Sequence, residues 1–252
     1  MPAVNIKDKV VFVTGANRGI GKSFATVALA QGAKKVYACA RTLSTLDELV
    51  ASDPDRVVAV ELDVTNQAQI DAAAAQATDL DILVNNAGMG ASLGAPVSSS
   101  TDEAGMRMEM DVNYFGILKM VRAFVPTLKN NGGGAIVNIL SIAGLMNFPF
   151  APGYSASKHA GHSMTQHLRA ELAGQNTLVT GVYPGPIDTD MAKDLPFDKA
   201  SPDSVAEKVY AAIAEGAEDV YPDPYAENFV QQLEADRKAL EKANAAVLGG
   251  SS

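Results

Sequence analysis

The chain has 252 residues, of which 47% are hydrophobic and 19% are charged, and its formal net charge at pH 7 is -9. This composition is typical of a folded domain and too apolar for a disordered chain. The negative charge disfavours general binding to nucleic acids or anionic membranes, because both present phosphate groups. The one cysteine, Cys39, excludes an intrachain disulfide and a cluster of thiolate zinc ligands.

The N-terminal residues 1–8 lack the apolar stretch of a signal peptide. No later apolar run reaches the length of a bilayer-spanning helix. We therefore expect a cytoplasmic protein that does not contact a membrane.

Short apolar runs alternate along the chain with stretches of helical length and period. The runs lie at residues 9–14, 35–40, 57–62, 82–84, 135–140 and 178–183. Because they are apolar throughout, they predict a parallel sheet covered by helices on both faces. No linker or repeat divides residues 1–252, so we expect one domain, a doubly wound three-layer α/β sandwich of the Rossmann type. A last helix is predicted at about residues 226–247, with an apolar stripe of Phe229, Val230, Leu233, Leu240 and Val247.

A glycine-rich turn follows the first predicted strand and opens a helix predicted at residues 22–31. It reads Thr14-Gly15-Ala16-Asn17-Arg18-Gly19-Ile20-Gly21. Glycines in such a turn let the backbone approach a pyrophosphate, whereas side chains would block the approach. The turn therefore predicts a dinucleotide site, with an ordinary tight turn as the alternative.

The residues after the second predicted strand indicate which ribose the site accepts, since an acidic residue there favours NAD. Here the strand runs into Arg41, and Arg18 stands within the glycine turn. Two guanidinium groups can clasp a 2′-phosphate, although either arginine alone could be a solvated surface charge. We therefore predict NADP(H) as the cofactor.

Seven motifs in a fixed order make the chain resemble the short-chain dehydrogenase/reductase family, from about Lys9 to Pro224. They are the glycine turn at 14–21, Asp63-Val64, Asn85-Asn86-Ala87-Gly88, Asn113, Ser141, Tyr154-x-x-x-Lys158 and Tyr183-Pro184-Gly185. Together with the glycine turn and the two arginines, the resemblance gives the full set of predicted cofactor contacts. These are Gly15, Asn17, Arg18, Gly19, Ile20, Gly21, Arg41, Asp63, Val64, Asn86, Ala87, Gly88, Tyr154, Lys158, Pro184, Gly185, Ile187 and Thr189.

Within that set the resemblance implies distinct roles. Asp63 is expected to hold the adenine amino group beside Val64, and residues 86–88 to line the adenosine side. Ile187 and Thr189 are expected to hold the nicotinamide carboxamide.

Tyr154 is the predicted acid/base of a hydride transfer, because reduction of a carbonyl creates an alkoxide that needs a proton. Lys158 lies one helical turn away, and its ammonium is expected to lower the phenol pKa from about 10 toward neutrality. The alternative is an ordinary amphipathic helix. Ser141 follows a strand at the carboxyl edge of the sheet, where functional groups gather. The resemblance implies that it holds the substrate oxygen.

Asn113 completes the predicted catalytic set. It lies in a helix-like stretch, residues 106–125, where asparagine is a poor helix former. A kink would explain it, and the resemblance implies instead that it holds a water that relays protons to Lys158. The three histidines, His159, His162 and His167, crowd one helix without a second ligand cluster, so we expect no metal site.

The residues expected beside the reacting carbonyl are mostly apolar. They are residues 142–151, Met89, Leu93, Met191 and Leu195. A pocket with few charges favours a neutral apolar ketone, aldehyde or secondary alcohol, although each residue alone could belong to the core. The covering segment, residues 184–202, is short, so broad substrate tolerance is expected.

The end of the chain departs from the family, because the usual last strand with its Asp-Gly-Gly ending is absent. The chain reads Asp219-Val220-Tyr221-Pro222-Asp223-Pro224 there. The family's usual dimer face is formed by the helices that carry Asn113 and Tyr154. We expect a homo-oligomer, either a dimer or a tetramer. In the family, the missing ending supports one contact of the tetramer.

Two other functions compete. A 3-ketoacyl thioester reductase would need cations for its phosphates, but Lys193 and Lys199 stand among Asp188, Asp190, Asp194 and Asp198. A dinucleotide-sensing protein without catalysis would share the fold. All four predicted catalytic positions are filled here, which favours an enzyme.

Overall fold

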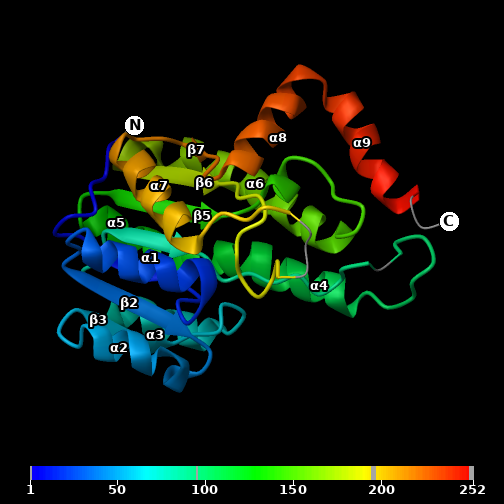
Figure 1. Cartoon of the computed structure of the whole chain (residues 1–252). Coiled ribbons are helices and arrows are strands. Elements are labelled where there is room, and N and C mark those ends of the chain that lie inside the picture. The colour runs from blue at the N-terminus through cyan, green and yellow to red at the C-terminus, as the bar shows by residue number, and fades with distance from the viewer. Residues whose placement is uncertain (1, 95, 194–196, 250–252) are drawn as a thin grey trace.

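A computed structural model describes residues 2–94, 96–193 and 197–249 (Figure 1). The described residues contain one seven-stranded sheet with every strand pair parallel, in the order β3-β2-β1-β4-β5-β6-β7. The strands are β1 Val10–Val13, β2 Lys35–Ala40, β3 Val57–Glu61, β4 Ile82–Asn85, β5 Gly134–Ile139, β6 Thr177–Val182 and β7 Asp219–Val220. The predicted doubly wound single domain is confirmed.

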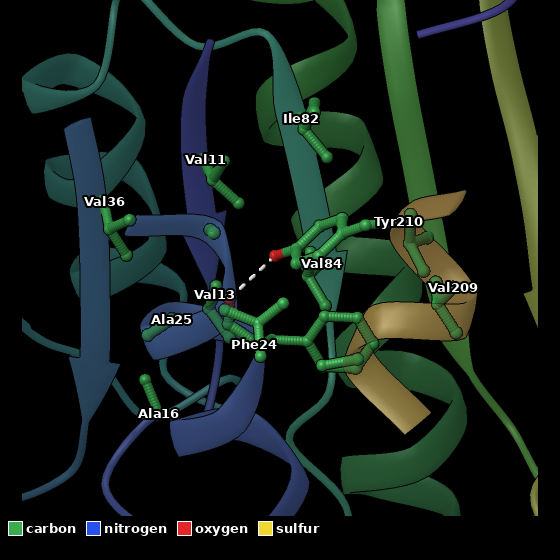
Figure 2. Packing of buried hydrophobic residues seen from close by; sticks show 14 of the residues in the cluster. Val11, Val13, Ala16, Phe24, Ala25, Val36, Ile82, Val84, Val209 and Tyr210 are labelled. Atoms are coloured by element: carbon green, nitrogen blue, oxygen red, sulfur yellow. Dashed lines mark hydrogen bonds between the residues drawn. The ribbon is translucent and has the colours of Figure 1, made fainter. Parts of the chain in front are cut away.

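Strand β1 shows how the sequence covers both faces of the sheet. Its neighbouring residues point to opposite faces. Val11 and Val13 join a cluster with Phe24 and Tyr210, whose rings form a T-shaped pair while the Tyr210 hydroxyl donates to the Phe24 carbonyl at 2.9 Å (Figure 2). Phe12 points the other way and packs on Phe124. A strand that is apolar throughout thus contributes side chains to the hydrophobic layers on both faces of the sheet.

The helices divide between these two layers. Helices α1 Gly19–Ala30, α2 Asp47–Ser52 and α7 Pro202–Ala214 contribute to the first, with η1 Leu43–Leu46. Helices α3 Gln67–Gln76, α5 Ile117–Asn130 and α6 Pro152–Leu172 contribute to the second. The single turns η3 Ile142–Gly144 and η4 Ala173–Gln175 stand beside α6. None of the described helices is long and apolar enough to cross a membrane.

The helix predicted around Asn113 contains a π-helical turn. Helix α4 Ala104–Met110 continues through η2 Asp111–Gly116 into α5. Such a bulge inserts an extra residue per turn and is frequent at functional sites. The kink interpretation of Asn113 therefore has a structural basis.

The single C-terminal helix predicted at 226–247 is wrong. Two helices, α8 Pro224–Ala235 and α9 Arg237–Gly249, form an angled pair in this region (Figure 1). Asp236 between them is extended, and its carboxylate caps α9 by accepting from the Lys238 and Ala239 amides at 3.0 and 2.9 Å. Most of the predicted stripe is buried, but the Val247 side chain lies outside the described part.

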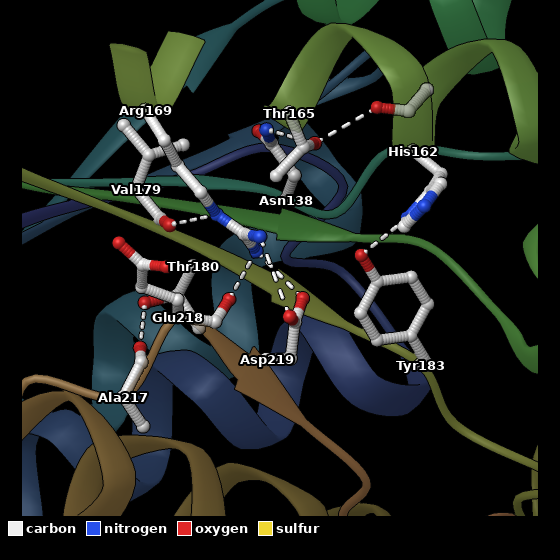
Figure 3. A network of polar contacts seen from close by, with 11 residues as sticks. Asn138, His162, Thr165, Arg169, Val179, Thr180, Tyr183, Ala217, Glu218 and Asp219 are labelled. Atoms are coloured by element: carbon white, nitrogen blue, oxygen red, sulfur yellow. Dashed lines mark hydrogen bonds and ion pairs between the residues drawn. The ribbon is translucent and has the colours of Figure 1, made fainter. Parts of the chain in front are cut away.

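The expected absence of a last strand is also wrong, although the Asp-Gly-Gly ending is indeed missing. Strand β7 has two residues that pair with Gly181 and Val182 of β6. The Arg169 guanidinium clamps this edge, since it donates to the Val179 and Glu218 carbonyls and forms an ion pair with Asp219 (Figure 3). Side-chain contacts thus supplement a ladder that is very short.

Candidate active site

Three predicted catalytic residues meet where β5 ends beside the first turns of α6. Ser141 follows β5, and its hydroxyl accepts from the Ala143 amide at 3.1 Å and donates to the Pro184 carbonyl at 3.4 Å. It also lies close enough to Tyr154 to lower the pKa of the phenol. Lys158 Nζ lies 5.6 Å from the centroid of the Tyr154 ring and donates to the Ile139 carbonyl at 2.8 Å. The helical spacing therefore places the amine beside the phenol ring, as the sequence predicts.

The acidities differ from the expectation. Burial and, to a smaller extent, the charge of Glu109 together raise the pKa of Tyr154 to about 12, although Ser141 acts to lower it. Burial lowers the pKa of Lys158 to about 8. The predicted lowering of the phenol pKa is therefore wrong for this structure. The reason is that desolvation disfavours both charged forms, and the amine is directed at Ile139 rather than at the phenol oxygen.

Asn113 is wholly buried and connects two parts of the site. Its Oδ1 accepts from the Met89 amide at 2.9 Å, and its Nδ2 donates to the Met89 carbonyl at 2.8 Å and to Ser157 Oγ at 2.9 Å. The Ser157 hydroxyl in turn donates to the Tyr154 carbonyl at 2.7 Å. Asn113 thus ties the segment after β4 to the turn of α6 that carries Tyr154. Its predicted water relay stays a prediction.

The glycine turn has the backbone shape that a phosphate cradle requires. Gly15 and Gly19 have φ values of 67° and 52°, in the left-handed region that favours glycine. A Cβ at Gly21 would clash with the Gly15 carbonyl. Asn86 fixes the turn against β4, because its Nδ2 donates to the Thr14 carbonyl at 2.8 Å. The residues present therefore fit a dinucleotide pyrophosphate.

The segment after β4 leads from this turn to the catalytic residues. The Asn86 and Ala87 amides donate to Thr14 Oγ1, each at 2.9 Å. At Gly88 a Cβ would lie 3.3 Å from Asn113 Oδ1 and 3.5 Å from Lys158 Nζ. The predicted adenosine-side residues and the catalytic residues thus form one continuous region along the carboxyl edge of the sheet.

The predicted ribose and adenine contacts lie at the ends of β2 and β3. Burial opposes ionisation of Asp63, but hydrogen bonds from Thr65 and the charges of Arg41 and Lys119 lower the pKa of its carboxyl. Arg41 is exposed, and Arg18 forms an exposed ion pair with Asp190 at 3.2 Å. The structure therefore places Arg41 in the electrostatic field of Asp63, with Arg18 paired to the segment after β6.

The remaining predicted cofactor residues take several positions. Asn17 is half-buried, while Ile20 packs against the core and Val64 is buried in it. Ile187 is buried, and a Cβ at Gly19 would lie 3.1 Å from Thr189 Cγ2. The loop after β6 therefore reaches back to the glycine turn.

Asp223 is a site residue that the sequence analysis missed. It is 1% exposed, and its Oδ2 accepts from the Gly185 amide at 2.8 Å. Its Oδ1 accepts from the Ala226 amide at 2.9 Å and caps α8. The dipeptide Asp223-Pro224 is a recognisable helix start, but its contact with Gly185 is not local in sequence. Asp223 holds the turn at which the nicotinamide end is predicted to lie.

The predicted substrate residues are only partly gathered. Phe148 stacks on Phe229 of α8, whereas Leu93 and Met191 are more than half exposed. Leu195 lies outside the described residues. A cavity of about 780 Å³ adjoins the Gly185 turn on its α8 side. It is lined by Phe197, Asp198, Lys199, Ala200, Asp223, Pro224 and Tyr225.

The three histidines of α6 have separate surroundings. His162 Nδ1 lies 2.7 Å from the Tyr183 hydroxyl (Figure 3), and His159 Nδ1 lies 2.9 Å from the Ser155 carbonyl. His167 is exposed beside Glu171. Across the described ranges no group of three or more histidine, cysteine, aspartate or glutamate side chains could hold a metal ion.

Comparisons with known proteins agree with this geometry. The family model described as short chain dehydrogenase matches residues 9–200. An uncharacterized oxidoreductase of Staphylococcus saprophyticus is 36% identical over 221 residues, which cover 83% of this chain and 93% of that protein.

Two solved structures are similar over nearly the whole chain. A short chain dehydrogenase from Burkholderia cenocepacia in complex with NADP is 43% identical, with a TM-score of 0.89 and coverage of 95% of this chain and 98% of that chain. A short chain dehydrogenase/reductase from Burkholderia phymatum in complex with NAD is 28% identical, with a TM-score of 0.81 and coverage of 93% and 96%.

With the motif residues gathered at one sheet edge and the match extending over most of the chain, this protein belongs to the short-chain dehydrogenase/reductase family and is an NAD(P)-dependent oxidoreductase acting on CH–OH and C=O groups.

Proposed function

We propose that this protein is an NADPH-dependent reductase of neutral, apolar ketones or aldehydes, which also oxidises the corresponding secondary alcohols with NADP. The observation that carries the proposal is the arrangement of Ser141, Tyr154 and Lys158 beside Gly88, where the predicted cofactor segment reaches the catalytic residues.

Each residue has a part in the reduction. The nicotinamide, when bound, supplies the hydride. The Tyr154 hydroxyl donates its proton to the carbonyl oxygen, and the Ser141 hydroxyl donates a hydrogen bond to the same oxygen. The protonated Lys158 amine, one helical turn away, stabilises the phenolate that remains on Tyr154. Asn113 keeps this turn of α6 in place through Ser157.

The preference for NADPH rests on the two arginines. Arg41 follows β2, where the ribose is expected, and no carboxylate stands between it and Asp47. Arg18 is exposed in the glycine turn and can exchange its exposed partner Asp190 for a phosphate, because surface ion pairs are weak. The similar Burkholderia cenocepacia protein, which is in complex with NADP, supports this choice.

The preference for a neutral substrate rests on the residues around the site. Phe148, Phe150 and Met146 form an apolar segment after η3. The thioester alternative is less favoured, since Lys193 and Lys199 stand near Asp188, Asp190 and Asp198. Asp194, the fourth acidic residue of this segment, lies outside the described part of the chain.

A panel of small and bulky ketones, aldehydes and alcohols, tested with NADPH and NADH by absorbance, checks the proposal. We expect turnover of several neutral ketones with NADPH and little with NADH. In Tyr154→Phe, kcat should fall by about a hundredfold to ten-thousandfold while NADPH binding is retained, because the general acid is lost. Equal turnover in Tyr154→Phe would overturn the assigned mechanism, and activity with phosphate-bearing thioesters alone would favour the alternative.

We further propose a homo-oligomer, either a dimer or a tetramer, in which the helices that carry Asn113 and Tyr154 form the dimer face. The cytoplasmic location remains a prediction.

A further inference from the structure

Glu109, at the end of α4, is a wholly buried acidic residue that none of the recognised motifs includes. Its Oε1 accepts from the Ala91 amide at 2.7 Å and the Ser92 amide at 3.0 Å. Its Oε2 accepts from the Ser92 hydroxyl at 2.6 Å. Burying a carboxylate is costly unless charge-assisted hydrogen bonds compensate. Here all three donors come from the segment after β4.

Two glycines allow α4 to approach this segment and α6 closely. A Cβ at Gly105 would lie 3.4 Å from the Ala91 carbonyl oxygen. At Gly153 a Cβ would clash with Glu109 Oε2 and lie 2.6 Å from Ser92 Oγ. Gly153 directly precedes Tyr154. The carboxylate of Glu109 therefore lies at the junction of the segment after β4 and the helix start that carries the predicted acid.

The segment from Met89 to Gly94 is held at three points. Asn113 holds Met89 at its beginning, and Glu109 holds its middle. At its end the Gly94 amide donates to the Phe150 carbonyl at 2.7 Å. Between these points a Cβ at Gly90 would lie 3.7 Å from Tyr154 Cδ2. The segment thus forms a wall beside Tyr154, joined to the apolar segment after η3.

We propose that Glu109 is a positioning residue, whose buried carboxylate fixes residues 90–92 beside Tyr154 and thereby sets the binding of the carbonyl substrate without affecting the dinucleotide. This proposal rests on the proposed reduction of a carbonyl substrate, and it applies to any ketone that the protein reduces. The glycine turn and Asp63 lie at other strand ends and make none of these contacts. Loss of Glu109 should therefore weaken the binding of the carbonyl substrate and leave the binding of the dinucleotide unchanged.

The test compares Glu109→Ala with Glu109→Gln. The glutamine oxygen can accept from the Ala91 and Ser92 amides, and its amide group can donate to Ser92 Oγ, whereas alanine leaves these donors without a partner. With a ketone that the wild type reduces, we expect Glu109→Ala to raise KM by about tenfold or more. Glu109→Gln should restore KM to within about threefold of the wild type. NADPH binding, followed by fluorescence, should stay within about twofold in both variants.

Glu103→Gln is the matched control, because Glu103 is an exposed acid directly before α4, paired with Arg107. Its kinetics should equal those of the wild type. Backbone hydrogen exchange supplies a readout that needs no turnover. The Ala91 and Ser92 amides should exchange about tenfold faster or more in Glu109→Ala than in the wild type, and near the wild-type rate in Glu109→Gln.

An unchanged KM or unchanged exchange of these amides in a folded Glu109→Ala variant would overturn the proposal. A parallel rise in the NADPH dissociation constant would also overturn it, because the role would then be general stability. If no ketone is reduced by the wild type, the proposed substrate class fails, but the exchange of the two amides still tests Glu109.

Discussion

Lys158 lowers the stability of the folded protein, because the residue is only 4% exposed and burial lowers the pKa of its amine to about 8. An unfolded chain has a lysine pKa near 10.5, so between pH 8 and 10.5 the unfolded state binds a proton that the folded state does not. Stability contributed by this group therefore rises with pH across that window, and below pH 8 the folded protein bears the full penalty.

The substitution Lys158→Met removes this penalty. We expect it to abolish turnover while raising the free energy of unfolding at pH 7 by on the order of 2 kcal/mol, after the lost hydrogen bond to Ile139 is allowed for. Denaturant unfolding at pH 7 and pH 10 measures the effect, which should shrink at the higher pH. Lys129→Met, at an exposed position in α5, is the control. A stability difference that does not change with pH would contradict the assignment.

We expect a single side chain, Arg41, to set the preference of the protein for NADPH over NADH. Its loss in Arg41→Ala should lower kcat/KM for NADPH by about tenfold to a hundredfold, because a charge-assisted contact with the 2′-phosphate disappears. The value for NADH should change little. Steady-state kinetics with both cofactors checks this, with Arg122→Ala, at an exposed position in α5, as the control. An equal fall in kcat/KM for both cofactors would show that Arg41 does not bind the 2′-phosphate.

At the scale of elements, Asp223 couples the start of α8 to the turn after β6. Asp223→Ala removes a helix cap and leaves the Gly185 amide unpaired. We expect the free energy of unfolding to fall by about 2 kcal/mol and kcat/KM to fall by about tenfold. Ser201→Ala removes the cap of α7 and should cost about 1 kcal/mol without a kinetic effect. If the Asp223→Ala variant is destabilised but fully active, the role of Asp223 is to cap α8 and not to hold the Gly185 turn for catalysis.

Six of the seven described strands and the motif residues could be predicted because their signals are local, whereas the two-residue β7 was missed. Apolar runs such as residues 35–40 coincide with strands, and the glycine turn is set by its own backbone. The break at Asp236 was not predicted, since one extended residue interrupts an otherwise continuous apolar stripe. The contact of Asp223 with Gly185 depends on how distant segments pack. The Tyr154 pKa depends on burial, which spacing along a helix does not give.

At the scale of the whole molecule, two exposed apolar side chains on the proposed dimer face support the proposed homo-oligomer. Phe115 in η2 and Met108 in α4 are 42% and 50% exposed. Large exposed apolar groups gather at protein interaction sites. We expect the wild type to be at least a dimer by light scattering, and Phe115→Lys to shift it toward the 26.3 kDa monomer. Leu43→Lys, at an exposed position in η1, should leave the mass unchanged. A monomeric wild type would refute the oligomer.

The family match ends at residue 200, yet Asp223 and Tyr225, which pack against Gly185, follow it in the chain. Replacing α8 and α9 would therefore change what packs against Gly185 while leaving the residues of the glycine turn in place. A chimera with a foreign C-terminal segment would be expected to inherit the donor's selectivity among ketones while retaining the recipient's coenzyme.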